Sequence, residues 1–331
     1  MPELPDVEAY RRFFRRYAAG RTVETISADP TIVRNATPQA LRQALKGRTF
    51  EDPDRHGKWL ICGTEGPALL LHFGMTGELV WSGEEPQRHR HDRLTIRFAG
   101  GEELRYRNMR KLGGVWLAHD EGEAQNILGT LGPDALAIGR REFLELLERR
   151  RGGVKAALMD QSFIAGVGNI IADEVLWHAR IHPRRRSESL GEEERKLLFT
   201  QLHGVLRDAV EGYDYIPRKR SWLSHVRGLP DARCPRCGSP LQRTTAAGRT
   251  TYFCSRCQGP DPYHGPGDRD SKDGADRGAL LRSARLARRG HRYPQRDPAV
   301  RDVGAAAGRS PRARTGRSRR APGSAGGSVN R

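Results

Sequence analysis

Short apolar runs, separated by glycine, proline and charged residues, fill the first 130 residues of the chain. They read TVETISA, KWLICG, ALLLHF, ELVWS, LTIRF, ELRYR and VWLA. Runs of this length, rich in β-branched and aromatic residues and bounded by turn formers, are typical of strands. Because no alternating β-α pattern interrupts them, they predict a β-sandwich.

Two helical patterns accompany these strands. Pro5 suits a first helical position, and apolar residues recur after it at helical spacing. Thr37 is an N-cap candidate followed by Pro38, and Gly47 lies beyond the end of the same short pattern. We therefore expect an N-terminal catalytic sandwich domain over residues 1–130, flanked by helices.

The pattern becomes helical from about residue 131, in REFLELLERR, VKAALMDQ, NIIADEVLWHAR and EERKLLFTQLHGVLRDAV. This pattern predicts a helical domain over residues 131–231, followed by a short cysteine-bearing module over 232–260. Residues 261–331 consist mainly of Arg, Gly, Ala, Ser, Pro and Asp, which predicts a disordered basic tail. The expected fold class is α+β.

Charge narrows the possible partners of these domains. The 331 residues carry a formal net charge of +18, with a pI near 10.4, so we expect a polyanionic partner, either nucleic acid or an acidic membrane surface. No apolar stretch approaches the length of a membrane span, and the start MPELPDVEAYRRFF is unlike a secretory signal. The sequence predicts a soluble, cytoplasmic protein.

Four of the five cysteines form two CxxC pairs with sixteen residues between them: Cys234, Cys237, Cys254 and Cys257. LQRTT and TTYF can pair as strands around AAGR, which brings four thiolates together as in a closed structural zinc site. A redox CxxC pair is the alternative. The hairpin would present Arg249 at its tip, and Cys62, in a strand-like run, is expected to be a buried thiol.

A glycine turn precedes one of the predicted helices, in DQSFIAGVGNIIADE. Gly166 and Gly168 permit a tight turn, and Asn169 is expected to cap a helix that starts at Ile170. Free backbone N–H groups at such a helix start suit a phosphate, and Lys155 is a candidate second ligand. An ordinary helix-turn-helix corner is the alternative.

The N-terminus has chemistry of its own. Removal of Met1 would leave Pro2 with a secondary amine, whose ordinary pKa is near 8 and would be lowered by a helix starting nearby. Such an amine can attack an electrophilic sugar carbon, with Glu3 as the proton donor. A proline that only starts a helix is the alternative.

PELPDVE, HGKWL, HFGMTG, AGVGNIIADE and GRTTYFCSRCQ, in this order over about residues 2–258, resemble the formamidopyrimidine-DNA glycosylase and endonuclease VIII family. The resemblance implies a β-sandwich, a helix-two-turn-helix domain and a zinc finger with one structural zinc ion and no organic cofactor. It also implies roles for four residues. Pro2 is the Schiff-base nucleophile, Glu3 the proton donor, Lys58 a phosphate-bound acid for β-elimination, and Arg249 the residue that grips the lesion phosphate and assists δ-elimination.

The resemblance further implies a set of DNA-binding residues. Met75 and Arg110 match the family's wedge, which fills the gap left by an extruded base. Glu174 matches a residue that borders the lesion pocket. The remaining matches to DNA contacts are His72, His89, Arg151, Lys155 and Asn169.

The chain departs from the family pattern at three points, of which the first and the third bear on specificity. Leu112 stands where many relatives have an aromatic wedge residue, and Asp6 replaces a common glutamate. The segment before Cys234 is short, and it carries a basic and aromatic cluster that can either stack on bases or pack in the core: Arg218, Lys219, Arg220 and Trp222.

The leading hypothesis is a DNA glycosylase and AP lyase that removes formamidopyrimidines, with 8-oxoguanine as a further candidate, from damaged double-stranded DNA. We expect a monomer that works at the bacterial nucleoid. The alternatives are an endonuclease VIII-like preference for oxidised pyrimidines and a non-catalytic protein that binds damaged DNA.

Overall fold

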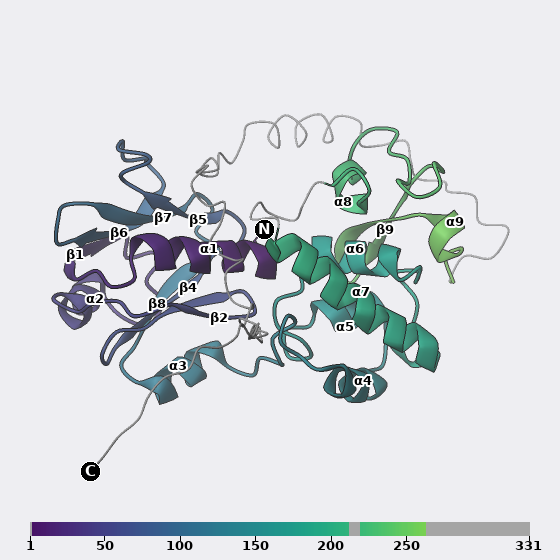
Figure 1. Ribbon diagram of the computed structural model, residues 1–331, viewed down its shortest axis with the longest axis horizontal. Helices are drawn as coiled ribbons and strands as arrows, with labels where there is room; N and C mark the ends of the chain where they lie inside the picture. Colours follow the sequence, from purple (N-terminus) through teal and green to yellow (C-terminus); the bar gives the residue numbers. More distant parts are fainter. Residues whose placement is uncertain (1, 212–218, 263–331) are drawn as a thin grey trace, which may run out of the picture. The chain divides into compact units, whose positions relative to one another are not determined.

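The computed structural model describes residues 2–211 and 219–262, whose helices and strands are labelled in Figure 1. Residues 263–331, which make up nearly all of the expected disordered tail, lie outside the described residues, as does Arg218. Within the two described ranges, no helix is long and apolar enough to cross a bilayer.

In the described part of the chain, the N-terminal strands form two antiparallel sheets of four strands each. The first has the order β1-β6-β7-β5, formed by Val23–Ala28, Asp92–Phe98, Glu103–Asn108 and Gly77–Trp81. The second has the order β2-β3-β4-β8, formed by Asp54–His56, Trp59–Cys62, Ala68–His72 and Gly114–Ala118. Alternate residues of β6 are buried, as is typical of a strand with one face in a core. The predicted sandwich is confirmed.

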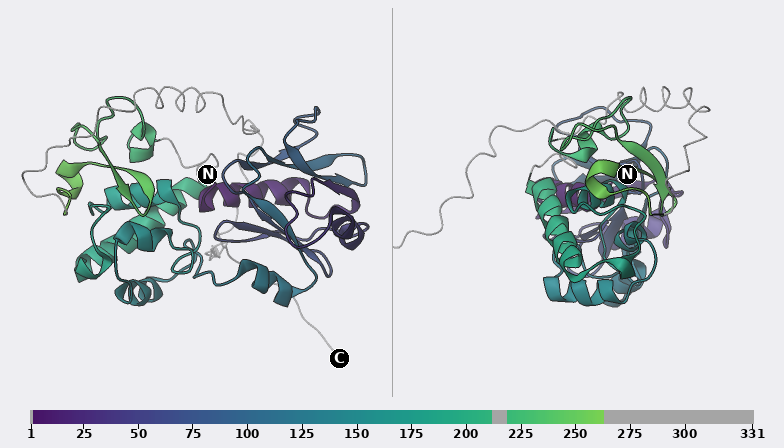
Figure 2. Two further views of the ribbon diagram at one scale, coloured as in Figure 1. Left: turned by 180° about the vertical axis from the view of Figure 1, so that it is seen from behind. Right: turned by 90° about the vertical axis from the view of Figure 1, so that its right-hand side faces the viewer.

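Helix α1 (Leu4–Tyr17) contacts both sheets and lies between them in the views of Figures 1 and 2. Its Tyr10 ring stacks on Phe73 with centroids 4.2 Å apart, and its Phe14 ring meets Phe50 edge-on at 5.0 Å. Aromatic pairs of this geometry add to the free energy gained from burial. The helix that begins with the N-terminal residues is therefore fixed on the sandwich core.

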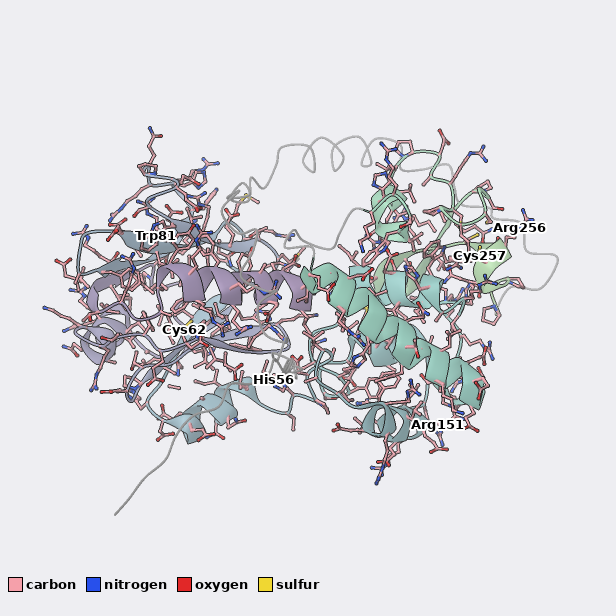
Figure 3. The ribbon with its side chains drawn as sticks, in the orientation of Figure 1. His56, Cys62, Trp81, Arg151, Arg256 and Cys257 are labelled. Atoms are coloured by element: carbon pink, nitrogen blue, oxygen red, sulfur yellow. The ribbon has the colours of Figure 1, made fainter. Side chains whose placement is uncertain are left out.

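Two sequence expectations about the sandwich are confirmed in detail. Helix α2 (Pro38–Leu45) is capped by Thr37, whose hydroxyl accepts a hydrogen bond from the Ala40 N–H at 3.0 Å. Cys62 is fully buried on β3, where burial raises the pKa of its thiol (Figure 3).

The helical part follows α3 (Glu121–Leu128). Helices α4 (Arg140–Glu148), α5 (Val154–Met159), α6 (Asn169–His178) and α7 (Glu192–Glu211) share a second core. The 3-10 turn Ser187–Ser189 contacts α4. Helix α6 also contacts α8 (Leu223–Val226), β10 (Arg249–Phe253) and α9 (Ser255–Gln258). Strand β10 pairs with β9 (Gln242–Ala246) as the predicted hairpin, with Arg249 opposite Ala246 next to the turn.

Candidate active site

The carboxylate of Glu3 lies at the N-terminus of α6, 165 residues away in the sequence. Its Oε2 accepts the N–H groups of Gly168 and Ile171, each at 3.0 Å, and its Oε1 accepts that of Ile170 at 2.8 Å. A Cβ at position 168 would lie 2.3 Å from Glu3 Cδ, so only glycine admits this approach. Glu3 is therefore buried, and its negative charge faces the positive end of the helix dipole.

This arrangement corrects two expectations about the glycine turn. Helix α6 begins at Asn169, its N-cap is Gly168, and the Asn169 side chain does not cap it. The first N–H groups are also not free for an external phosphate, because Glu3 already accepts three of them. The turn binds an anion as expected, but the anion belongs to the chain itself.

Lys58 lies in the turn between β2 and β3, and the helical part of the chain holds this turn in place. Arg55 of β2, whose side chain is 7% exposed, pairs with Asp134 and with Glu8 of α1. Asp134 also accepts the Gly57 N–H at 2.7 Å. Gly57 has a φ of 56°, and a Cβ there would lie 2.8 Å from the Ala165 side chain. The turn thus lies close to the loop that leads into α6.

A cavity of about 270 Å³ opens where these segments meet. Its lining comes from the N-terminus, the sandwich, the helical part and the tip of the zinc hairpin: Pro2, Lys58, Trp59, His72, Gly74, Leu131, Met159, Gln161, Gly168 and Arg249. The structure therefore brings together Pro2, Lys58, His72 and Arg249, which the sequence placed far apart.

Electrostatics distinguishes the basic groups of this cavity. Burial lowers the pKa of Lys58, while the negative charge of Glu3 opposes the shift and the positive charge of Arg249 adds to it. Burial and the nearby charge of Lys58 lower the pKa of His72 to about 4, so its ring is neutral at pH 7. Two cations and one neutral donor thus converge on a space beside Pro2, an arrangement suited to a phosphate.

Asp6 is a buried carboxyl in the same corner that sequence reasoning treated only as a mild departure. Its Oδ2 accepts the Glu3 N–H at 2.6 Å, and its Oδ1 has no hydrogen-bond partner among the described residues. Burial, reinforced by the charge of Glu3, raises the pKa of Asp6 to about 7, against the hydrogen bond from the Glu3 backbone. Its signal in the sequence is an acid among the apolar residues that begin the predicted helix, Leu4, Pro5 and Val7.

Lys155 and Asn169, both expected to contact DNA, belong to one buried network. The Lys155 ammonium is fully buried, pairs with Asp173 Oδ1 at 2.6 Å, and donates to Asn169 Oδ1 at 2.7 Å and Thr251 Oγ1 at 2.6 Å. The Asn169 amide donates to the Thr250 carbonyl at 3.2 Å. The Lys155 ammonium thus pairs directly with Asp173, and its charge also acts on Glu3, the anion at the start of α6. Its expected contact with DNA stays a prediction.

The candidate wedge residues lie together at the surface. Arg110 Nη1 is 3.2 Å from Met75 Sδ, and the Arg110 N–H donates to Thr76 in the turn that carries Met75. Met75 and Leu112 are among the large apolar side chains that remain exposed, at 37% and 55%. Sequence reasoning missed Met109, which is 53% exposed beside them. The patch of Met75, Met109, Arg110 and Leu112 is suited to apolar contact outside the protein.

The remaining candidates lie in different settings. His89 is exposed in the loop before β6, and Arg151 is exposed after α4, where it donates to the Glu148 carbonyl (Figure 3). Glu174 is fully buried and accepts the Leu223 and Ser224 N–H groups at 3.0 and 2.8 Å, at the start of α8. Trp222 is 3% exposed and packs in the helical core, so stacking on bases is excluded for it in this structure.

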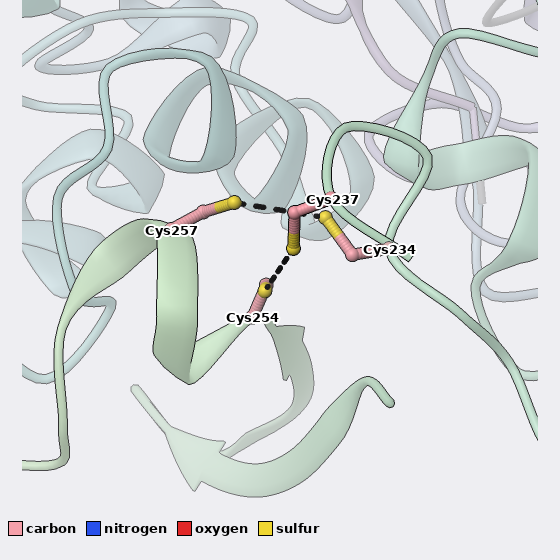
Figure 4. Close-up of side chains that lie close together, drawn as sticks. All are labelled: Cys234, Cys237, Cys254 and Cys257. Carbon is pink, nitrogen blue, oxygen red and sulfur yellow. Dashed lines mark hydrogen bonds between the residues drawn. The ribbon is translucent and has the colours of Figure 1, made fainter. Parts of the chain in front are cut away.

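The four cysteine sulfurs of the hairpin lie within 4.8 Å of one another (Figure 4). The Sγ atoms of Cys234 and Cys257 are 3.8 Å apart, and those of Cys237 and Cys254 are 3.5 Å apart. Tetrahedral thiolates bound to zinc at about 2.3 Å would have their sulfurs about 3.8 Å apart. The cluster therefore fits one zinc ion closed on all sides by sulfur, which stabilises the hairpin and leaves no position for substrate.

The sandwich, the helical part and the zinc hairpin around a basic cavity together define a zinc-finger DNA glycosylase. Family models match the chain over all three: the formamidopyrimidine-DNA glycosylase N-terminal domain over residues 1–115, its H2TH domain over 131–218, and the zinc finger found in FPG and IleRS over 233–259. The chain belongs to the formamidopyrimidine-DNA glycosylase family.

Curated relatives and solved structures agree with this assignment. The chain is 36% identical over 266 residues to the formamidopyrimidine-DNA glycosylase of Geobacter metallireducens and 34% identical over 272 residues to that of Vibrio cholerae. Each match covers 78% of this chain and all of the relative. The Lactococcus lactis Fpg in complex with DNA containing an abasic site matches with a TM-score of 0.70 at 32% identity, over 77% of this chain and 99% of that one.

Proposed function

We propose that this chain is a bifunctional DNA glycosylase and AP lyase of base-excision repair, which removes formamidopyrimidines and 8-oxoguanine from damaged double-stranded DNA. The observation that carries the proposal is the cavity shared by Pro2, Lys58, His72 and Arg249 beside the carboxylate of Glu3. The substrate class is supported by the names of the relatives and by solved neighbours that hold Fapy-dG or abasic DNA.

The catalytic steps follow from the groups around the cavity. After Met1 is removed, the Pro2 nitrogen attacks C1′ of the damaged nucleoside, and the bond from C1′ to the base breaks with its electrons going to the base. The carboxylate of Glu3 takes the proton that the Pro2 nitrogen loses and passes it to the ring oxygen, so the sugar opens and an iminium joins C1′ to Pro2. The iminium then acts as the electron sink for the lyase steps.

Two eliminations complete the reaction. Loss of a C2′ proton expels the 3′ phosphate, to which Lys58 supplies acid, and loss of a C4′ proton expels the 5′ phosphate, whose charge Arg249 stabilises. Hydrolysis of the iminium then frees Pro2. One zinc ion on the four cysteines would hold the hairpin that carries Arg249, and it would take no part in bond breaking.

DNA binding would use the remaining candidates. His72 and Asn169 are assigned to the phosphates around the lesion, His89 and Arg151 to more distant backbone, and Met75 with Arg110 to the gap left by the extruded base. Lys155 and Glu174 would act from beneath the surface, by holding the residues that touch DNA. Domain boundaries near residues 130, 231 and 260 and a place of action at the bacterial nucleoid complete the proposal.

Borohydride trapping tests the proposal directly. The purified protein is incubated with duplexes that contain formamidopyrimidine, 8-oxoguanine, an oxidised pyrimidine or an abasic site, and is then reduced. A covalent adduct is expected with the first two and with the abasic site, and it should vanish when an N-terminal tag blocks the Pro2 nitrogen. Tight binding without an adduct from any duplex would leave only a DNA-binding protein, and a preference for the pyrimidine would indicate an endonuclease VIII-like enzyme.

A further inference from the structure

Arg227 links three parts of the molecule and has no role in the mechanism above. It follows α8 in the segment that leads to the zinc cysteines. Its Nε donates to Asp173 Oδ2 at 3.0 Å, its Nη2 donates to the Thr250 carbonyl at 3.0 Å, and its guanidinium lies over the Tyr252 ring at 5.1 Å. One planar side chain thus joins α6 to two residues of β10.

Asp173, the partner of Arg227, lies in the centre of the buried network described above. It is 2% exposed, pairs with Lys155 as well as Arg227, and accepts the Tyr252 N–H at 3.4 Å. A buried carboxylate that has lost its water needs such partners, and removing one of them leaves an uncompensated charge. The Asp173 network therefore permits few alternative positions of β10.

The network acts on the strand next to Arg249. Arg249 is the first residue of β10, and the three residues that follow it, Thr250 to Tyr252, each bond to Asn169, Lys155, Asp173 or Arg227. The Arg249 side chain itself is exposed and lines the cavity. Its position over the cavity therefore depends on where the network holds the backbone of β10.

We infer that Arg227 is a positioning residue for Arg249 and that, through it, Arg227 sets how often β-elimination is followed by δ-elimination. The inference rests on the proposed function, in which Arg249 serves the second elimination. Misplacement of a charged group by about 1 Å can cost about 100-fold in the step that it serves. The Pro2 steps, whose partner Glu3 is held by the start of α6, do not depend on this contact.

The experiment compares the two eliminations in single turnovers on a duplex with one abasic site. The zinc-loaded full chain is compared with Arg227→Gln, Arg227→Lys and a matched control, Arg243→Gln, which removes one exposed positive charge from β9 of the same hairpin. Denaturing gels separate the β product from the β,δ product, borohydride trapping reports the Pro2 adduct, and metal analysis reports zinc.

We expect Arg227→Gln to lower the ratio of β,δ to β product by about 10-fold or more, the effect typical of losing a residue that orients a functional group. Trapping should stay near the wild-type yield. Arg227→Lys should give an intermediate ratio, because an ammonium keeps the positive charge beside Asp173 but loses the planar contact with the Tyr252 ring. Arg243→Gln should match wild type. If Arg227→Gln loses zinc, Arg227→Lys is used in its place, and a ratio of β,δ to β product below that of wild type supports the positioning role.

The outcomes separate the inference from the function on which it rests. A wild-type ratio in the zinc-loaded Arg227 variants, with normal trapping, overturns the positioning role alone. Absence of any wild-type adduct overturns the proposed function and the inference with it. A parallel fall of both products in Arg227→Gln and Arg243→Gln would indicate only weaker DNA binding and would also overturn the inference.

Discussion

Helix α6 is held at its start by Glu3 and along its side by the Asp173 network. Both regions contain a buried carboxylate, but the carboxylates differ in the groups that hold them. Glu3 is held by uncharged backbone N–H groups. Asp173 is held by two cations, Lys155 and Arg227. The start of α6 therefore holds a carboxylate that has no cation as a direct partner, while Asp173 within α6 is paired with two.

The difference indicates which carboxylate can do chemistry. Neutral donors orient Glu3 without pairing it to a cation, so its charge still acts on Lys58 and on the space beside Pro2. The charge of Asp173, in contrast, is balanced by Lys155 and Arg227, so this carboxylate serves to anchor the hairpin. The first region suits proton transfer, and the second suits positioning.

Removal of zinc should have the largest effect, because it dismantles the hairpin that the Asp173 network anchors. Structural zinc sites contribute about 10–16 kcal/mol of apparent binding free energy to the fold of small zinc domains. We expect chelation to abolish incision of abasic DNA while the sandwich retains its secondary structure, measured by gel and circular dichroism. Zinc should restore incision, and Cys62→Ala should keep a full zinc content. Undiminished incision by zinc-free protein would contradict the role given to the hairpin.

Glu3→Gln changes the other region. The amide cannot give up a proton, and one of its two ends is a donor that faces backbone donors, so we expect base excision to slow by about 10²–10⁴-fold, the usual contribution of a general acid. Single-turnover excision of formamidopyrimidine measures this loss. Zinc content and the β9-β10 hairpin should be unaffected. Excision within a few-fold of wild type would remove Glu3 from the chemistry.

The sequence predicted most of the local structure but not these two regions. Apolar runs such as KWLICG and the cap at Thr37 depend on neighbouring residues, so their patterns were sufficient. The capping role of Asn169 was predicted wrongly because the group that accepts the first N–H groups of α6 lies 165 residues away. Long-range partners leave no local pattern.

The residues of the candidate site also divide into those that a local motif predicts and those that only long-range contacts reveal. Motifs carried by the resemblance brought Pro2, Lys58 and Arg249 to attention, whereas Asp173 and Arg227 were missed. A weak signal existed: two acids, ADE, interrupt the apolar run NIIADEVLW, and acids inside a buried helix need partners. The sequence gives no indication that Arg227 is one of those partners.

Glu174→Gln tests whether a carboxylate at a helix start always serves chemistry. Glu174 accepts two N–H groups of α8 much as Glu3 does on α6, but it does not line the cavity. We expect the free energy of unfolding to fall by about 1–3 kcal/mol, as for other buried hydrogen-bonded groups, and excision to fall less than in Glu3→Gln. Urea unfolding measures the change in the free energy of unfolding. Glu123→Gln, at an exposed glutamate that accepts a backbone N–H, should change stability by less than about 0.5 kcal/mol.

Asp6→Asn addresses the second carboxyl on the Glu3 side. It should have the smallest effect on excision, and its main effect should be a change in the pH dependence of stability. The folded pKa of Asp6, about 7, is above its ordinary value of 3.8, so between these values the folded state holds a proton that the unfolded state has lost. This group therefore lowers the stability of the protein as pH rises from about 4 to 7, by at most about 1.4 kcal/mol per pH unit. Burial also raises the pKa of Glu78 to about 7, so Glu78 adds a similar pH dependence to the stability of both proteins. Urea unfolding of the wild type and of Asp6→Asn at pH 5, 6, 7 and 8 therefore isolates the contribution of Asp6. The variant should lose less stability than wild type over this range, and equal slopes would show that Asp6 is ionised in the folded protein at pH 5.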